Sequence, residues 1–318
     1  MTGADYVRSI QVFRAVAAIM VVLFHASNGA FAVGAAGVDV FFVISGFIMG
    51  SIGIHETARS FALRRLVRIV PLYWTVTLSI CLASLLPDMF SSFSFDAVRL
   101  LKSLFFIPYF NEHHQPWPLL VAGWTLNDEM IFYVVFALGL AAGHPVVLTA
   151  SVLTLGWLAG LVVPHRSAIL DAWTDQIVLE FAFGLLLSRA KWPSTALLGP
   201  ALLIAGIAGL SFSTSATNIP DARLLTWGVP ALLLVAGGVV MERRGHWPRM
   251  RALERIGDAS YSIYLLHGIV IAAVHKYGPD GRLSPAVMIG GSLASGYACH
   301  RLFERPVARM LLRYRYLR

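Results

Sequence analysis

The chain has 318 residues, of which 57% are hydrophobic and only 13% are charged, and its mean hydropathy is +0.70. Soluble domains are about a quarter charged, so this composition excludes an ordinary soluble protein and indicates an integral membrane protein. The formal net charge of +8 is compatible with nucleic-acid binding, but a membrane protein with a positive cytoplasmic face carries the same excess. We therefore expect no nucleic-acid partner and a lipid bilayer around the chain.

Apolar segments long enough to span a bilayer recur along the whole sequence. Turns rich in Gly, Pro, Asn and Asp separate most of them. Residues 87–123 are too polar for a simple span and predict a short interfacial helix with a loop. The sequence thus predicts an all-α membrane protein with a single domain over residues 1–318 and no appended soluble domain. The ten expected spans lie near 9–29, 36–54, 69–86, 124–142, 145–163, 174–190, 196–212, 224–241, 259–277 and 284–303.

The distribution of Lys and Arg predicts the orientation, because cytoplasmic loops are enriched in these residues. With the N-terminus inside, nineteen of the 25 Lys and Arg residues lie on the cytoplasmic side. Ten spans return the C-terminus to that side, so we expect both termini in the cytoplasm. Residues 1–30 also resemble a cleavable signal peptide, but Arg14 and His25 interrupt its apolar run, and we expect it to be retained.

Arg14 and His25 lie inside the first expected span, where ionisable groups are costly and often mark a functional site. They are eleven residues apart, so they share one helix face and lie about 16 Å apart along the axis. Arg14 is expected near the cytoplasmic end and His25 near the outer end. Two simpler interpretations stay open: Arg14 as an interfacial anchor, and His25 as a hydrogen-bonded packing residue.

Other polar residues extend this pattern into two layers. Asp39, Asp128 and Glu129 are expected within about 8 Å of the outer boundary, at the level of His25. Asp39 alone is equally typical of a helix N-cap, and Glu129 of a structural pair. The inner layer is basic and comprises Arg14, Arg65, Arg68, Arg255 and Arg301.

This distribution predicts a transfer reaction across the membrane. A neutral imidazole beside a carboxylate can act as general base toward a hydroxyl, or can itself carry an acyl group. Clustered arginines bind phosphates. We therefore expect a phosphorylated donor on the inside and a hydroxyl acceptor on the outside. The sequence has no His/Cys cluster with metal-ligand spacing, so no metal site is expected.

The residues that carry these charges lie in a series of longer motifs. They occur in the order Arg14-x10-His25, "GVDVFFVISGFIM", "FALRRLVRIVPLYW", "WTLNDEMIFYVVF", "IGDASYSIYLLHG" and "LFERP". Together they resemble acyltransferase family 3, the ten-span bacterial membrane acyltransferases, and among these the exopolysaccharide O-acetyltransferases. The resemblance covers nearly the whole chain.

The resemblance implies an O-acetyltransferase of the bacterial cytoplasmic (inner) membrane, with acetyl-CoA as the acyl donor and no permanently bound cofactor. The acceptor is expected to be a hydroxyl on an extracytoplasmic or lipid-linked saccharide, and polysaccharide-synthesis machinery is a potential partner. His25 is implied as the catalytic residue, with Glu129 and Asp39 as acidic partners. The Asp128 carboxyl next to Glu129 departs from the family pattern and leaves the acid–base assignment open. The implied donor-binding residues are Arg14, Arg65, Arg68, Ser260, Tyr261 and His267.

Several alternatives stay open at this level. Ser260 and Tyr261 can cap a helix instead of lining a donor entrance. His267 can bond to a neighbouring helix instead of lining the donor path. A transporter could use the intramembrane Arg, His and Glu residues as a relay, although the sequence shows no internal repeat. A membrane scaffold would not need His25. Direct transfer and an acyl-histidine intermediate are both compatible with the sequence.

Overall fold

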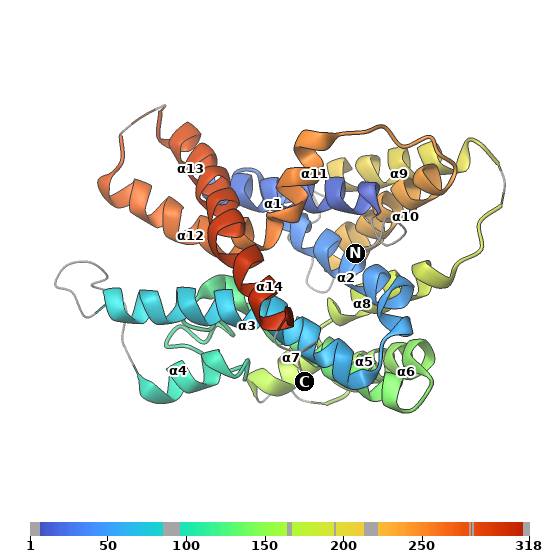
Figure 1. Cartoon of the computed structure of the whole chain (residues 1–318), viewed down its shortest axis with the longest axis horizontal. Coiled ribbons are helices and arrows are strands. Elements are labelled where there is room, and N and C mark those ends of the chain that lie inside the picture. Colours follow the sequence, from blue (N-terminus) through green and yellow to red (C-terminus); the bar gives the residue numbers. More distant parts are fainter. Residues whose placement is uncertain are drawn as a thin grey trace.

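The computed structural model describes residues 7–84, 96–163, 167–193, 195–212, 222–279, 281 and 283–313. These residues form helices, turns and loops and contain no strand, which confirms the all-α prediction. Figure 1 shows the helices in one assembly, with α14 passing over α3. The α-helices are α1 (Arg8–Ala26), α2 (Gly37–Ser51), α3 (Ala58–Ala83), α4 (Ala97–Leu104), α5 (Trp124–Ala141), α6 (Pro145–Gly160), α7 (Ala168–Thr174), α8 (Val178–Arg189), α9 (Leu198–Phe212), α10 (Val229–Arg243), α11 (Arg251–Asp258), α12 (Ser260–Tyr277), α13 (Leu283–Cys299) and α14 (Arg305–Arg313). The π-helical turns η5 (Leu224–Gly228) and η6 (His300–Glu304) precede α10 and α14, respectively.

Each of the ten expected spans overlaps one of these helices. By length and apolar composition, five helical segments can cross a membrane, and the α11–α12 pair, bent by 71°, makes up to six. The helices α6 and α9 are apolar but shorter. The described residues therefore form an apolar helical protein suited to a membrane. The number of ten spans and the cytoplasmic position of both termini stay predictions.

The start of α3 differs from the expectation. The helix begins at Ala58, well before residue 69, because the Thr57 side chain accepts the Ser60 N–H at 3.2 Å and caps its N-terminus. Hydropathy places the start of an apolar span after the arginines, although the helix itself already includes them. As a result, Arg65 and Arg68 lie within a helix, two to three turns from its start, instead of at a loop boundary.

A short helix was expected between residues 87 and 123, and α4 confirms it. The Asp96 carboxylate accepts the Val98 N–H at 2.9 Å and caps α4, whose Val98 and Leu101 side chains are exposed. The Trp74 indole of α3 donates a hydrogen bond to the Leu104 carbonyl at 2.8 Å, which fixes the end of α4 against α3. Residues 87–95 of the expected segment lie outside the described part of the chain.

Helices α2 and α8 pack together through glycines. A Cβ atom at Gly46 would lie 2.0 Å from the Phe181 carbonyl oxygen, and one at Gly184 would lie 1.9 Å from the Val43 carbonyl oxygen. Only hydrogen atoms fit between the two backbones, as in other small-residue contacts between membrane helices. This close contact fixes the middle turns of α2 against those of α8.

The N-terminus of α1 is held by a residue from α10. The Glu242 carboxylate accepts the Arg8 and Ser9 backbone N–H groups, both at 2.7 Å, and the Ser9 hydroxyl at 2.6 Å. A carboxylate at this point satisfies free N–H groups and interacts favourably with the helix dipole. This contact fixes the helix that carries Arg14 and His25.

Candidate active site

Side chains from α1, α2, α3, α5 and α12 surround a cavity with an empty volume of about 730 Å³. The cavity therefore collects residues from most of the length of the chain. Its walls include six of the residues singled out from the sequence, namely Arg14, Arg65, Arg68, Glu129, Ser260 and Tyr261.

One wall of the cavity is basic. Arg14 is only 7% exposed and donates to the Gln11 side-chain oxygen at 3.0 Å, and Arg68 lies within electrostatic range of it. The Arg65 guanidinium lies 5.5 Å from the centre of the Phe61 ring, and its Nε atom is buried without a hydrogen-bond acceptor. Within the described part of the chain, none of the three guanidinium groups forms an ion pair. Arg14 is buried and Arg65 and Arg68 are partly buried, and cations without an ion-pair partner in such a place favour an anionic ligand.

Glu129 borders the same cavity as these arginines. Its carboxylate accepts hydrogen bonds from the Ser45 hydroxyl, at 2.9 Å, and from the Tyr133 hydroxyl. Glu129 and the arginines thus line one cavity, and an outer layer shared by Glu129 and His25 stays a prediction.

His25 lies at the other end of α1 from Arg14, one residue before the helix ends, and its side chain is exposed. Its ring centre lies 5.0 Å from that of His267, which is only 3% exposed. The His267 Nδ1 donates to the Tyr264 carbonyl oxygen at 2.5 Å, because a carbonyl can only accept, and neutral His267 keeps Nε2 as an acceptor. Tyr264 lines the cavity, so His267 and Tyr264 connect His25 to it.

Ser260 and Tyr261 face the cavity at the start of α12. Neither side chain caps this helix, so the capping alternative is wrong for both. The Ser260 hydroxyl is buried without a hydrogen-bond partner, and the Tyr261 hydroxyl donates to the Ile69 carbonyl at 2.8 Å. A free buried hydroxyl on the cavity wall can bond to a ligand.

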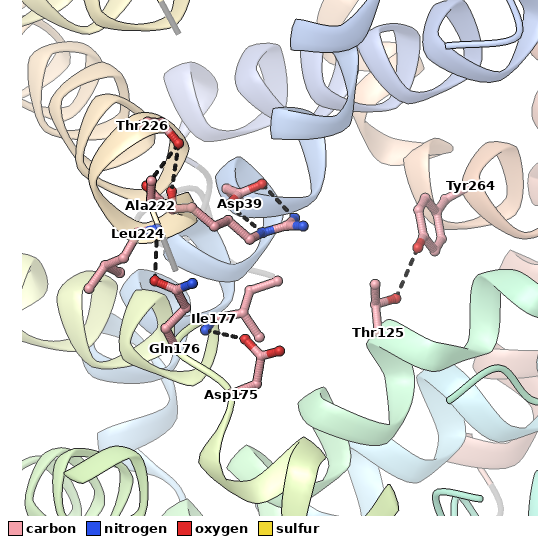
Figure 2. Close-up of polar contacts among 10 residues, drawn as sticks. Asp39, Thr125, Asp175, Gln176, Ile177, Ala222, Leu224, Thr226 and Tyr264 are labelled. Atoms are coloured by element: carbon pink, nitrogen blue, oxygen red, sulfur yellow. Dashed lines mark hydrogen bonds and ion pairs between the residues drawn. The ribbon is translucent and has the colours of Figure 1, made fainter. Parts of the chain in front are cut away.

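Asp39 is the third residue of α2 and lies in a second polar group, apart from the residues that line the cavity. It does not cap α2, since the N-cap residue is Ala36 and makes no side-chain cap. Both of its carboxylate oxygens instead accept hydrogen bonds from Arg223, from Nε at 3.1 Å and from Nη2 at 2.9 Å. Figure 2 shows the Asp39 carboxylate in this ion pair, with Asp175 nearby.

Sequence reasoning missed Arg223. It was counted only as an outer-side cation, although it lies directly before an apolar segment and four residues before Trp227. Its guanidinium lies 5.0 Å from the Trp227 ring centre and 6.0 Å from that of Trp124. An isolated Arg next to a tryptophan-bearing span is a signal that could have been used. Its partner, Asp39, could not have been read from the local sequence.

The arrangement has two chemically different ends. The cavity presents cations that need an anion, whereas His25 presents an imidazole at an exposed helix end. Among the described residues, no group of three or more His, Cys, Asp or Glu side chains could hold a metal ion. An imidazole between an anion-binding wall and an open face is suited to transferring a group from a phosphorylated carrier to an outside acceptor.

The comparisons with known proteins agree with this chemistry. The model of the family described as acyltransferase domain matches residues 7–301. The exopolysaccharide production protein ExoZ of Rhizobium meliloti (strain 1021) is 36% identical over 303 residues, which cover 90% of this chain and 94% of ExoZ. The acyltransferase MdmB of Streptomyces mycarofaciens is 25% identical over 340 residues, which cover 89% of this chain and 83% of MdmB.

The O-acetyltransferase OatA of Staphylococcus aureus (strain NCTC 8325 / PS 47) is 25% identical over 355 residues, which cover 97% of this chain but only 58% of OatA. No solved structure matches the chain. The family model and the similarity to ExoZ both extend over nearly the full sequence, and the described helices are apolar enough for a membrane. The chain therefore belongs to the acyltransferase domain family, acyltransferase family 3, and is a membrane acyltransferase.

Proposed function

We propose that this protein is an O-acetyltransferase that moves an acetyl group from cytoplasmic acetyl-CoA to a hydroxyl of an extracytoplasmic or lipid-linked saccharide. Its membrane would be the bacterial inner membrane, and exopolysaccharide is the proposed acceptor class. The observation that carries the proposal is a cavity lined by three arginines that form no ion pair with the described residues. Its wall residue Tyr264 contacts His267, whose ring neighbours that of the exposed His25. The names of OatA, an O-acetyltransferase, and ExoZ, an exopolysaccharide production protein, support the same chemistry.

The donor end of the reaction is assigned to the basic wall. The phosphates of acetyl-CoA would pair with Arg65 and Arg68, with Arg14 deeper in the cavity. The pantetheine arm would extend past Ser260 and Tyr261 toward His25. Arg14 and His25 lie about 16 Å apart along α1, so an elongated carrier is needed to connect the two.

The transfer step requires His25 to be neutral. Its imidazole would take the proton from the acceptor hydroxyl as the new C–O bond forms at the thioester carbonyl carbon. The C–S bond then breaks, and the CoA thiolate takes up the proton to leave as a thiol. In the alternative route, His25 itself forms the first bond to the acetyl carbon and passes the group on. His267 would hold the His25 ring, and the proposed acidic partners are Glu129 beside the donor and Asp39 on the outer side.

The proposal is tested with purified protein in detergent and radiolabelled acetyl-CoA. Wild type is compared with His25→Ala and with His275→Ala, which removes an exposed imidazole at the end of α12. We expect His25→Ala to abolish acetyl-CoA cleavage and saccharide labelling, and His275→Ala to leave both unchanged. Label on the protein would indicate an acyl-histidine, and cleavage only with saccharide would indicate direct transfer. An active His25→Ala variant would refute the assignment of His25, whereas a folded wild type that neither binds nor cleaves acetyl-CoA would favour a scaffold or transporter.

A further inference from the structure

Five charged residues gather where four helical segments begin. We refer to Asp39, Asp128, Asp175, Glu180 and Arg223 as the outer polar cluster. Asp39 and Glu180 lie in the first turns of α2 and α8, and Asp128 is the fifth residue of α5. Asp175 lies between α7 and α8, three residues before α8 begins, and Arg223 directly precedes η5. In the predicted orientation all of these segments enter the membrane from outside. Figure 2 shows Asp39 and Asp175 on one side of the view and the hydrogen-bonded Thr125–Tyr264 pair on the other.

The cluster has more hydrogen-bond acceptors than donors. Arg223 is its only cation, and its Nε and Nη2 donate to Asp39. Glu180 is fully buried within electrostatic range of Arg223, and its carboxyl group shares a hydrogen bond with that of Asp39. Asp128 is 5% exposed and, in the described part of the chain, makes no side-chain hydrogen bond. Buried acceptors without donors are unfavourable, so this cluster is suited to a ligand that brings donors.

The acidic charge of the cluster indicates which class of ligand can supply hydrogen-bond donors to it. A phosphate or a carboxylate brings no donors and would be repelled by the acidic residues. The hydroxyls of an uncharged sugar bring several donors without adding charge. Trp124 and Trp227 flank Arg223 and are half-buried, and indole faces offer the apolar surface on which a sugar ring can pack.

The cluster also lies on the path to the transfer site. Tyr264 is within electrostatic range of Arg223 and Asp128, and its ring centre is 5.7 Å from that of His267. The His267 ring is in turn 5.0 Å from His25. The cluster is therefore linked to His25 through Tyr264 and His267. The partly exposed Arg223 and the exposed Asp175 form the open edge of the cluster.

We propose that the outer polar cluster is the acceptor site, that it binds an uncharged sugar residue through its hydroxyl groups, and that it rejects anionic sugars. This inference rests on the proposed function, since it names the substrate class of the same enzyme. Asp39, Glu180 and Arg223 form the fixed frame of the site, while Asp128 accepts from a sugar hydroxyl. Trp124 and Trp227 support the ring.

The test compares two tetrasaccharide probes, neutral cellotetraose and anionic tetragalacturonate. Label transfer from radiolabelled acetyl-CoA is measured for each, and direct binding is followed by tryptophan fluorescence. We expect cellotetraose to bind and to be labelled, and tetragalacturonate to do neither. If tetragalacturonate binds as well as cellotetraose, or if neither probe binds, the inference fails. Tryptophan fluorescence measures sugar binding without acetyl transfer. A failure of selective sugar binding is therefore distinguishable from acetyl-CoA cleavage that does not depend on His25, which would refute the proposed function.

The variants separate binding from folding. Asp128→Asn keeps the size of the side chain and breaks no ion pair, so it does not leave a buried charge without its partner. We expect it to raise KM for cellotetraose at least tenfold and to change KM for acetyl-CoA less than twofold. Trp227→Leu should also raise KM for cellotetraose. Glu112→Gln, which removes an exposed carboxylate from the α4–α5 loop, is the matched control. Equal cellotetraose KM values for Asp128→Asn and Glu112→Gln would overturn the assignment.

Discussion

Gly184→Ala should separate α2 from α8 and lower the stability of the protein. The new Cβ would lie 1.9 Å from the Val43 carbonyl oxygen and 2.7 Å from the Phe47 nitrogen, whereas ordinary contact begins at 3.4 Å. Both neighbours are backbone atoms of a helix, so neither can rotate away. Overpacking of this kind costs about 1–3 kcal/mol, and the better helix propensity of Ala returns up to about 1 kcal/mol. We therefore expect a net loss of about 1–2 kcal/mol.

The assay is thermal unfolding in detergent, followed by size-exclusion chromatography of the heated samples. At roughly 2–4 °C per kcal/mol, the apparent Tm should fall by about 2–8 °C. The matched control is Gly290→Ala in α13, where a Cβ would meet nothing within 4 Å, and its Tm should not fall. The fraction of Gly184→Ala protein that remains folded should also show a raised KM for the acceptor, because α2 and α8 carry Asp39 and Glu180. Equal Tm values for the two variants would refute the packing argument.

Three further substitutions test the contacts around the site. Glu242→Gln removes the charge that holds the start of α1 and should lower stability by about 1 kcal/mol in the same unfolding assay; an unchanged Tm would contradict this. Tyr133→Phe removes a hydrogen bond to Glu129 and should lower kcat by up to about tenfold, equal to ~1.4 kcal/mol, in steady-state kinetics; an unchanged kcat would show that this bond has no role. Arg68→Ala should raise KM for acetyl-CoA by about 10- to 100-fold, because a hydrogen bond to a charged group contributes about 1.5–3 kcal/mol. Arg64→Ala, on the exposed side of α3, should leave KM for acetyl-CoA unchanged. Equal KM values for Arg68→Ala and Arg64→Ala would place the donor site elsewhere.

The helices were predictable because the physical signal for them is local. Apolar length, turn residues and the spacing of Arg14 and His25 are all properties of short stretches of sequence. The start of α3 was not predicted, since its first turns carry arginines that hydropathy excludes from a span. The Thr57 cap could have corrected this, because an N-cap residue marks where a helix begins regardless of how polar its first turn is.

The site was predictable only in part, because its contacts join distant segments. Six of the nine singled-out residues line one cavity, as expected of a common site. The sequence did not show that Glu129 borders the same cavity as the arginines, since the register between α3 and α5 is set by packing. The ion pair of Asp39 with Arg223 joins residues 184 positions apart. Single-sequence reasoning contains no information on which spans are neighbours, so it could not find this pair.

The two polar groups of the protein are complementary in a way that gives the proposed reaction a direction. The cavity wall contains three arginines that form no ion pair with the described residues, although Glu129 borders the same cavity. The outer polar cluster contains four carboxyl groups and one cation, Arg223. A phosphorylated carrier is attracted by the first and repelled by the second, whereas an uncharged sugar can supply hydrogen-bond donors to the second. Binding of the sugar in the arginine cavity, or of the phosphorylated carrier at the outer polar cluster, would therefore be unfavourable. His25, between these environments, is the place where an acyl group arriving from one side meets a hydroxyl arriving from the other.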